Sequence, residues 1–186
     1  AGLFFILRKG GPRLDPKRVV VALFENKTGD PNLDNLGYMA SNRITQGLSQ
    51  IEFVSLSSLQ DPGAIQRAAQ ERKGDPVTLL AKETQAGKVV TGSYYLQGER
   101  LQFQSQVQEG KSGKILASIE PVSGPLEEPI KLIESLRQRV MGSLAMVTDE
   151  RVKEFLTPDQ APYIPTYEAY KEYIEGARFF SKYEYA

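Results

Sequence analysis

Apolar residues in the first part of the chain fall in short continuous runs separated by helical patterns. The run over residues 19–24 is rich in β-branched side chains, which is typical of a strand buried on both faces of a sheet. Apolar positions at helical spacing follow over residues 33–51, and a second apolar run occupies residues 53–56. Helices are predicted again from Asp61 onward and over residues 77–85. This βαβα order favours parallel strands joined by right-handed crossovers.

The pattern then changes to strands in series. Residues 89–96, 101–108 and 115–119 are predicted to form a meander, with turns at residues 97–100 and 109–114. The middle strand alternates strictly between two faces. One face carries glutamines, and the other carries Leu101, Phe103, Ser105 and Val107.

A long helix is predicted after the meander, starting near residue 126. Its apolar side carries Ile130, Ile133, Val140, Leu144 and Val147. The chain is therefore predicted to be an α/β protein with a mixed sheet of about five strands, βαβα and then a β-meander. About three helices cover this sheet, and a C-terminal helical repeat fragment follows.

The two ends of the chain differ from this central pattern. Residues 1–7 are apolar and stop at basic residues, which predicts that residues 1–12 are the end of a transmembrane helix with its basic stop. A short buried strand or a signal-peptide remnant is the alternative. Residues 13–18 are predicted to be a linker, because Pro12 and Pro16 oppose a helix. The α/β domain is assigned to residues 13–148, a second linker to 149–165, and a helical segment to 166–186.

Composition excludes several kinds of chemistry. The chain has no cysteine and no histidine, which removes disulfides, nucleophilic triads with histidine, and zinc sites built on imidazole or thiolate. A cation site built from carboxylates alone stays open. The 23 acidic and 23 basic residues balance, so no field of one sign exists to gather nucleic acid. We therefore predict no catalytic residue, no metal, no cofactor and no nucleic-acid partner.

The polar loop after the first strand is the best candidate for a ligand site. It leaves the carboxyl end of a predicted parallel strand and enters a helix, where open α/β sheets bind ligands. Its helix-start amides would suit an anion. The alternative is structural, because the same residue types form tight loops and helix caps. The candidate ligand-binding residues are Asn26, Thr28, Gly29, Asp30 and Asn32.

Two further patterns concern the meander. The sequence Gly110-Lys111-Ser112 is similar to part of a phosphate loop, but Ser105 stands where that motif needs a glycine, and a strand follows. It is therefore predicted to be a hairpin turn. The glutamines at positions 102, 104, 106 and 108 predict a solvated strand face, with an interaction surface as the alternative.

Several motifs resemble those of one family. The first two motifs, at the end of the first strand and in the loop after it, are Phe24-Glu25-Asn26 and Thr28-Gly29-Asp30-Pro31. The next two are the strand Val89-Val90-Thr91-Gly92-Ser93 and the turn Gly98-Glu99-Arg100. In this order they are similar to the motifs of the TolB amino-terminal-like domain of bacterial signalling proteins, over residues 18–147. The chain lacks the tryptophan that the family carries after its last hairpin.

The last segment resembles the start of a tetratricopeptide repeat, through Glu168-Ala169-Tyr170 and the later aromatic residues up to Tyr185. Such a repeat buries its aromatic positions only against its neighbours. We therefore expect a repeat array to continue after residue 186 and to bind protein partners.

The resemblance also implies a function, because the family often joins a Ser/Thr kinase domain, a transmembrane helix, a TolB-like domain and such repeats. It implies a non-catalytic sensory and protein-interaction module, the extracytoplasmic (periplasmic) part of a membrane-anchored kinase-type receptor. A small ligand and a homo-oligomer are further partners to consider. The alternative is a cytoplasmic, membrane-anchored regulatory or scaffold domain, which Arg8 and Lys9 favour under the positive-inside rule.

Overall fold

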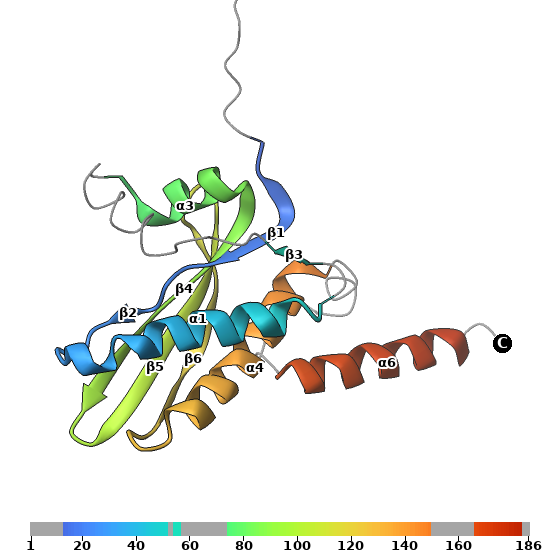
Figure 1. The fold of residues 1–186 in the computed structure, drawn as a ribbon. Helices are drawn as coiled ribbons and strands as arrows, with labels where there is room; N and C mark the ends of the chain where they lie inside the picture. Colours follow the sequence, from blue (N-terminus) through green and yellow to red (C-terminus); the bar gives the residue numbers. More distant parts are fainter. Residues whose placement is uncertain (1–12, 52–53, 57–73, 150–165, 184–186) are drawn as a thin grey trace, which may run out of the picture.

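The computed structural model describes residues 13–51, 54–56, 74–149 and 166–183. These residues form one six-stranded sheet with helices packed on it (Figure 1). The order across the sheet is β3-β1-β4-β5-β6, and β2 pairs with β4. The predicted α/β fold with a mixed sheet is confirmed, and the short β2 is the strand beyond the five expected. The strands are β1 (Asp15–Val21), β2 (Glu25–Asn26), β3 (Ser55–Leu56), β4 (Ala86–Gln97), β5 (Arg100–Glu109) and β6 (Ile115–Pro125).

The direction of strand pairing changes at β4. β1 pairs parallel with β3 and β4, and β2 also pairs parallel with β4, whereas β4, β5 and β6 form an antiparallel meander. Gly98 and Gly113 adopt φ values of +60° and +71° in the two meander turns, a conformation that favours glycine. The Gly110-Lys111-Ser112 sequence lies in the β5–β6 turn, as predicted.

The larger core lies between the sheet and two helices, α1 (Asn35–Leu48) and α4 (Pro129–Thr148). The alternation predicted for β5 is confirmed, because Leu101, Phe103 and Val107 are fully buried in this core. Ala40 and Ile44 of α1 are fully buried as well, as their helical spacing predicts.

Helix α4 departs from its predicted face at one residue. Ile133, Val140 and Leu144 are buried, but Ile130 is 47% exposed, so the prediction for Ile130 is wrong. The helix begins only at Pro129. Near its start, Leu132 packs closely on Gly124 of β6, since a Cβ atom at position 124 would lie only 2.6 Å from Leu132 Cδ2. Leu132 is therefore the buried residue at this end of the helix, where the helical spacing predicts Ile130.

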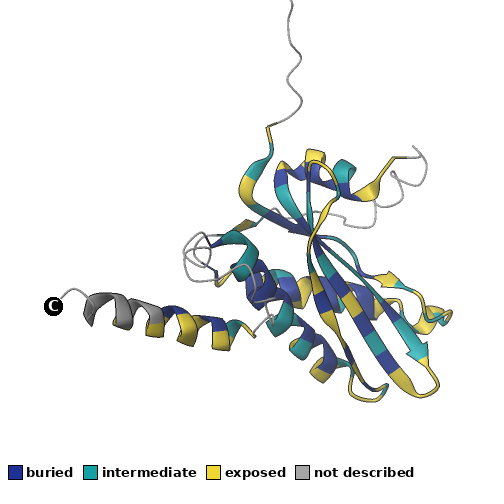
Figure 2. Cartoon of the chain, turned by 180° about the vertical axis from the view of Figure 1, so that it is seen from behind, coloured by how far each residue is buried: buried dark blue, intermediate teal, exposed yellow. Residues whose placement is uncertain are grey.

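Helix α3 (Pro76–Thr84) covers one end of the opposite sheet face. Val77 and Leu80 form a smaller core there with Val20 and Val89. The helix starts at Asp75, whose carboxylate accepts a hydrogen bond from the backbone N–H of Thr78 at 3.0 Å. β1 is thus buried on both faces, as predicted. Within the described residues, no helix covers the rest of this face over β4 and β5 (Figure 2).

Two predicted boundaries near the N-terminal end are wrong. The linker predicted over residues 13–18 overlaps β1, which begins at Asp15 and pairs there with Ala86. An irregularity in the register between Asp15 and Val19 accommodates Pro16 within the strand. The strand predicted over residues 19–24 ends at Val21. Phe24 instead packs its ring over Gly92 of β4, and the chain rejoins the sheet only at β2.

Helix α6 (Tyr167–Tyr183) confirms the helix predicted in residues 166–186. Tyr170 and Ile174 pack against Ala145 of α4, and the Tyr170 hydroxyl donates to Asp149 Oδ2. The expectation that only a following repeat covers these aromatic residues is therefore wrong for Tyr170. Tyr173 and Phe179, by contrast, are exposed.

Some predictions fall outside the described residues. These are the transmembrane segment over residues 1–12, the helix from Asp61, and the linker from residue 150 to 165. In the part of the chain that the structure describes, no helix is both long and apolar enough to cross a bilayer.

Candidate functional site

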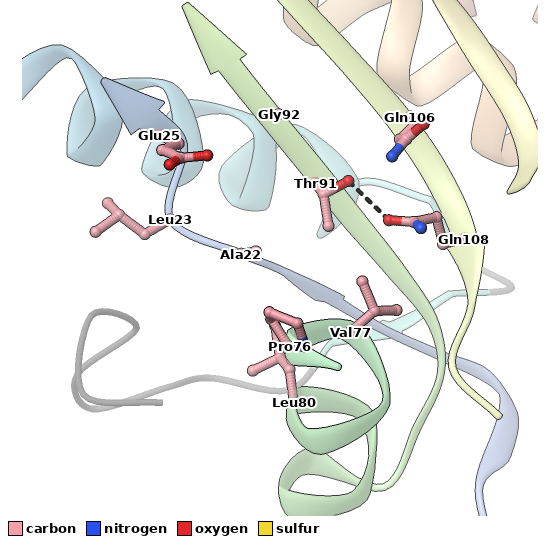
Figure 3. Close-up of a pocket in the computed structure, with 10 residues that line it drawn as sticks. All are labelled: Ala22, Leu23, Glu25, Pro76, Val77, Leu80, Thr91, Gly92, Gln106 and Gln108. Carbon is pink, nitrogen blue, oxygen red and sulfur yellow. Dashed lines mark hydrogen bonds between the residues drawn. The ribbon is translucent and has the colours of Figure 1, made fainter. Parts of the chain in front are cut away.

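A groove runs over the uncovered face of the sheet, from α3 past β2 to β6. It consists of two adjoining hollows of about 290 and 510 Å³. Both hollows are lined by Glu25, Thr91, Gly92 and Gln106, so they form one continuous depression. Figure 3 shows the smaller hollow, with α3 on one side and the polar side chains of β4 and β5 on the other.

One end of the groove is apolar. Leu23 lines it from the segment between β1 and β2, and Pro76 and Leu80 line it from the first turns of α3 (Figure 3). Leu23 reaches the groove because residues 22–24 leave the regular strand path. The apolar end therefore depends on the break in the strand and on the position of α3.

The other end is polar and follows from the register of the meander. Thr91 lies opposite Gln106, and Ser93 lies opposite Gln104, on the face away from the main core. The Thr91 hydroxyl donates to Gln108 Oε1 at 2.9 Å, and Gln108 Nε2 donates to the Gly113 carbonyl oxygen at 2.9 Å. The Gln106 side chain makes no hydrogen bond to any described residue, so its amide can bond to a ligand in the groove.

The groove carries almost no charge. Glu25 is the one charged residue that lines either hollow among the described residues. Its carboxylate pairs with Lys27 Nζ at 2.6 Å, and hydrogen bonding to Glu25 raises the pKa of Lys27. Across the described part of the chain, no three His, Cys, Asp or Glu side chains lie close enough to hold a metal ion. The arrangement suits an uncharged ligand with an apolar group at one end.

The sequence-predicted ligand loop lies next to the groove, and its polar groups bond to one another. Asn26 Nδ2 donates to Asp34 Oδ1 at 2.6 Å and to the Asp30 carbonyl oxygen at 2.9 Å. Asn26 Oδ1 accepts from the backbone N–H of Thr28 at 2.9 Å and from its hydroxyl at 2.6 Å. Asn26 thus ties the loop together from its centre.

The remaining loop residues form a turn and a cap. Gly29 has a φ of +81°, and Asp30 is the N-cap of the short 3₁₀ helix Pro31–Leu33. Asp30 Oδ1 accepts from the backbone N–H of Asn32 at 2.9 Å and from its side-chain amide at 2.8 Å. These contacts are the ones that the structural alternative requires. Ligand binding by Asn26, Thr28, Gly29, Asp30 and Asn32 stays a prediction.

The groove was only partly visible in the sequence. The sequence predicts a solvated glutamine face on β5, with an interaction surface as the alternative, and Gln104, Gln106 and Gln108 do line the groove. The contributions of Leu23 and Pro76 were missed. Their one signal is an apolar residue and a proline next to predicted loops, which is too common to indicate a site.

The chain is similar to several solved structures, but it matches no known sequence family. No family model matches the chain, and no curated protein matches it in sequence. A lipoprotein, GNA1162 from Neisseria meningitidis, is 12% identical over 69% of this chain and 99% of its own, with a TM-score of 0.46. The LpoB C-terminal domain from Salmonella enterica is 16% identical over 60% of this chain and 84% of its own, with a TM-score of 0.43.

TolB from Acinetobacter baumannii is also among the similar structures. It is 13% identical over 74% of this chain and 29% of its own, with a TM-score of 0.40. At these identities and TM-scores the similarity assigns neither a family nor a function to the chain. Membership of the TolB-like family, with its kinase and repeat context, therefore stays a prediction.

Proposed function

We propose that the chain is a non-catalytic interaction module of a membrane-anchored bacterial signalling protein, and that it binds a protein segment in the sheet-face groove. The chemistry of the groove is the observation that carries this proposal. Leu23, Pro76 and Leu80 form an apolar end, and uncharged amide and hydroxyl groups form the other end.

An extended protein segment fits these two ends. A glutamine amide both donates and accepts hydrogen bonds, as the backbone of an extended peptide does. The apolar end can take an apolar side chain of the same segment, which supplies most of the free energy in interfaces of this kind. The single carboxylate of the groove, Glu25, is already paired with Lys27. This favours binding over acid–base chemistry.

Site-specific photocrosslinking tests the groove. A benzophenone amino acid is placed at Gln104, which lines the groove, or at Glu127, which is exposed near the start of α4. In cells that make the whole protein, we expect one defined adduct from position 104 and none from position 127. Adding Gln106→Arg should reduce this adduct about ten-fold, because it adds a bulky positive charge to a groove whose single carboxylate, Glu25, is already paired with Lys27.

Gln97→Arg, the same change at an exposed position at the end of β4, is the matched control and should leave the adduct unchanged. Equal adducts from positions 104 and 127 would contradict the proposal. So would an adduct that Gln106→Arg does not weaken.

The module is proposed to be the extracytoplasmic part of a Ser/Thr kinase-type receptor. The cytoplasmic scaffold is the second candidate, and it would recruit partners through the helical segment of α6, where Tyr173 is exposed. The two candidates differ in the side of the membrane on which the domain lies, and this difference can be measured directly.

Thiol labelling determines the side. The chain has no cysteine, so Glu127→Cys adds its single thiol at an exposed position. We expect a membrane-impermeant maleimide to label this variant of the whole protein in intact cells. In the unsubstituted protein, residues 1–186 should not be labelled. Labelling only after the cells are opened would contradict the extracytoplasmic proposal and support the cytoplasmic one.

A further inference from the structure

The outer edge of β6 is a second surface of interest, on a strand whose Ser118 and Ile119 also line the groove. β6 is the last strand in the sheet order, and no described residue pairs with its outer side. The unpaired N–H and C=O groups of such an edge can pair with another strand, and proteins commonly block them.

The second half of β6 is blocked. Pro121 and Pro125 have no backbone N–H to donate. Arg139 of α4 donates through Nη1 to the carbonyl oxygens of Glu120 at 3.1 Å and Pro121 at 3.3 Å. The register of β6 against β5 shifts in both halves of the strand, between the partners of Phe103 and Ser105 and between the partners of Val107 and Gln108, so the prolines and Arg139 are what distinguish the second half. A new strand therefore cannot pair regularly beyond residue 119.

The first half of β6, residues 115–119, contains no proline, and no arginine bond to its backbone is present among the described residues. Ile115 and Leu116 are consecutive, and they are 50% and 39% exposed. An open edge that also exposes large aliphatic side chains is the kind of edge that pairs with another strand.

Opposite charges lie at the two ends of this open segment. Lys114 precedes it and Glu120 follows it, and both residues are exposed. The Glu120 side chain stays 75% exposed although its Oε2 accepts from Arg139. The segment is therefore complementary in charge to a copy of itself that runs in the opposite direction.

We propose that residues 115–119 pair antiparallel with the same residues of a second copy, which gives a two-fold dimer with a continuous sheet. The antiparallel arrangement brings Lys114 of each copy beside Glu120 of the other, so two ion pairs flank the apolar centre. A parallel arrangement would place Lys114 beside Lys114 and Glu120 beside Glu120. The occupant of the edge is thus a second copy of this chain.

Charge reversal with mixing tests the pairing. In the Lys114→Glu dimer, positions 114 and 120 that face each other across the interface are both glutamate, so two pairs of like charges flank the centre. In the Glu120→Lys dimer, the same positions are both lysine. We expect each variant alone to dimerise at least about ten-fold more weakly than the wild type in sedimentation equilibrium. In an equimolar mixture of the two variants both flanking pairs again have opposite charges, so the wild-type affinity should return.

Lys82→Glu, the same charge reversal on the exposed surface of α3, is the control and should not change dimerisation. Rescue on mixing also excludes misfolding, because two misfolded chains would not restore each other. A wild type that stays monomeric at its highest soluble concentration overturns the proposal. A dimer that neither single variant weakens, or variants that mixing does not rescue, overturns it too.

Discussion

Replacement of Gly92 by alanine is expected to lower the free energy of unfolding by about 3 kcal/mol, near the upper end for overpacking of a core. A Cβ atom at position 92 would lie 2.1 Å from Cε1 of Phe24 and 2.5 Å from Cδ1 and Cζ. The Phe24 ring is buried, so it cannot turn aside into solvent. Alanine in place of a strand glycine gains only about 0.5–1 kcal/mol of backbone entropy, so the steric overlap decides the sign. Urea unfolding measures the change.

A second substitution tests the cause. Phe24→Ala alone should cost about 3–5 kcal/mol, because it empties a buried site. If the ring is what opposes Cβ at position 92, the double variant should lose at least about 1 kcal/mol less than the sum of the two single losses. Gly74→Ala is the matched control, since no described residue lies within 4 Å of a Cβ there. Strict additivity of the two changes would contradict the packing argument.

The contact between Phe24 and Gly92 also shapes the candidate site. The Phe24 ring occupies the space over Gly92, in the detour between Ala22, whose N–H still donates to the Val90 carbonyl oxygen, and β2. Leu23, within this detour, lines the apolar end of the groove, and Glu25 follows it. A substitution at Gly92 should therefore weaken binding in the groove as well as stability.

Local pattern predicted the elements whose environment repeats regularly along the chain. The alternation of Leu101, Phe103 and Val107 predicted β5 and its buried face, because each of these residues meets the same core. The break at residues 22–24 could not be predicted in this way. It depends on a glycine in β4, whereas the apolar run itself continues through Phe24.

The candidate site was harder to predict than the fold, because it is assembled by strand register. Thr91 and Gln106 share the groove only because β4 and β5 pair in the observed register, and α3 then closes the apolar end. In the predicted ligand loop, Asn26 and Asp30 do lie together, but their side chains bond within the loop. Residue types alone do not distinguish a loop that stabilises itself from one that binds a ligand.

Removal of the Tyr94 hydroxyl is expected to change the pH dependence of stability as well as stability itself. Tyr94 is fully buried, and its hydroxyl donates to the Leu33 carbonyl oxygen at 2.9 Å. Tyr94→Phe keeps the ring contact with Phe103, whose centroid lies 5.4 Å away. At neutral pH the variant should lose about 1–1.5 kcal/mol, because the Leu33 carbonyl oxygen loses this donor.

At alkaline pH the order of stabilities should reverse. Burial, assisted by the nearby Asp34 carboxylate, raises the pKa of Tyr94 from 10.0 to about 12. Between these values the unfolded chain releases the phenolic proton and the folded protein keeps it, so the unfolded state binds fewer protons and wild-type stability falls as pH rises. The full difference in pKa corresponds to roughly 3 kcal/mol, which exceeds the neutral-pH loss of the variant. Urea unfolding from pH 7 to pH 12 should therefore show the wild type more stable at first and Tyr94→Phe more stable at the end.

Tyr38→Phe, at an exposed position of α1, is the control, and its curve should run parallel to that of the wild type. A Tyr94→Phe curve that also stays parallel to the wild type would contradict the prediction.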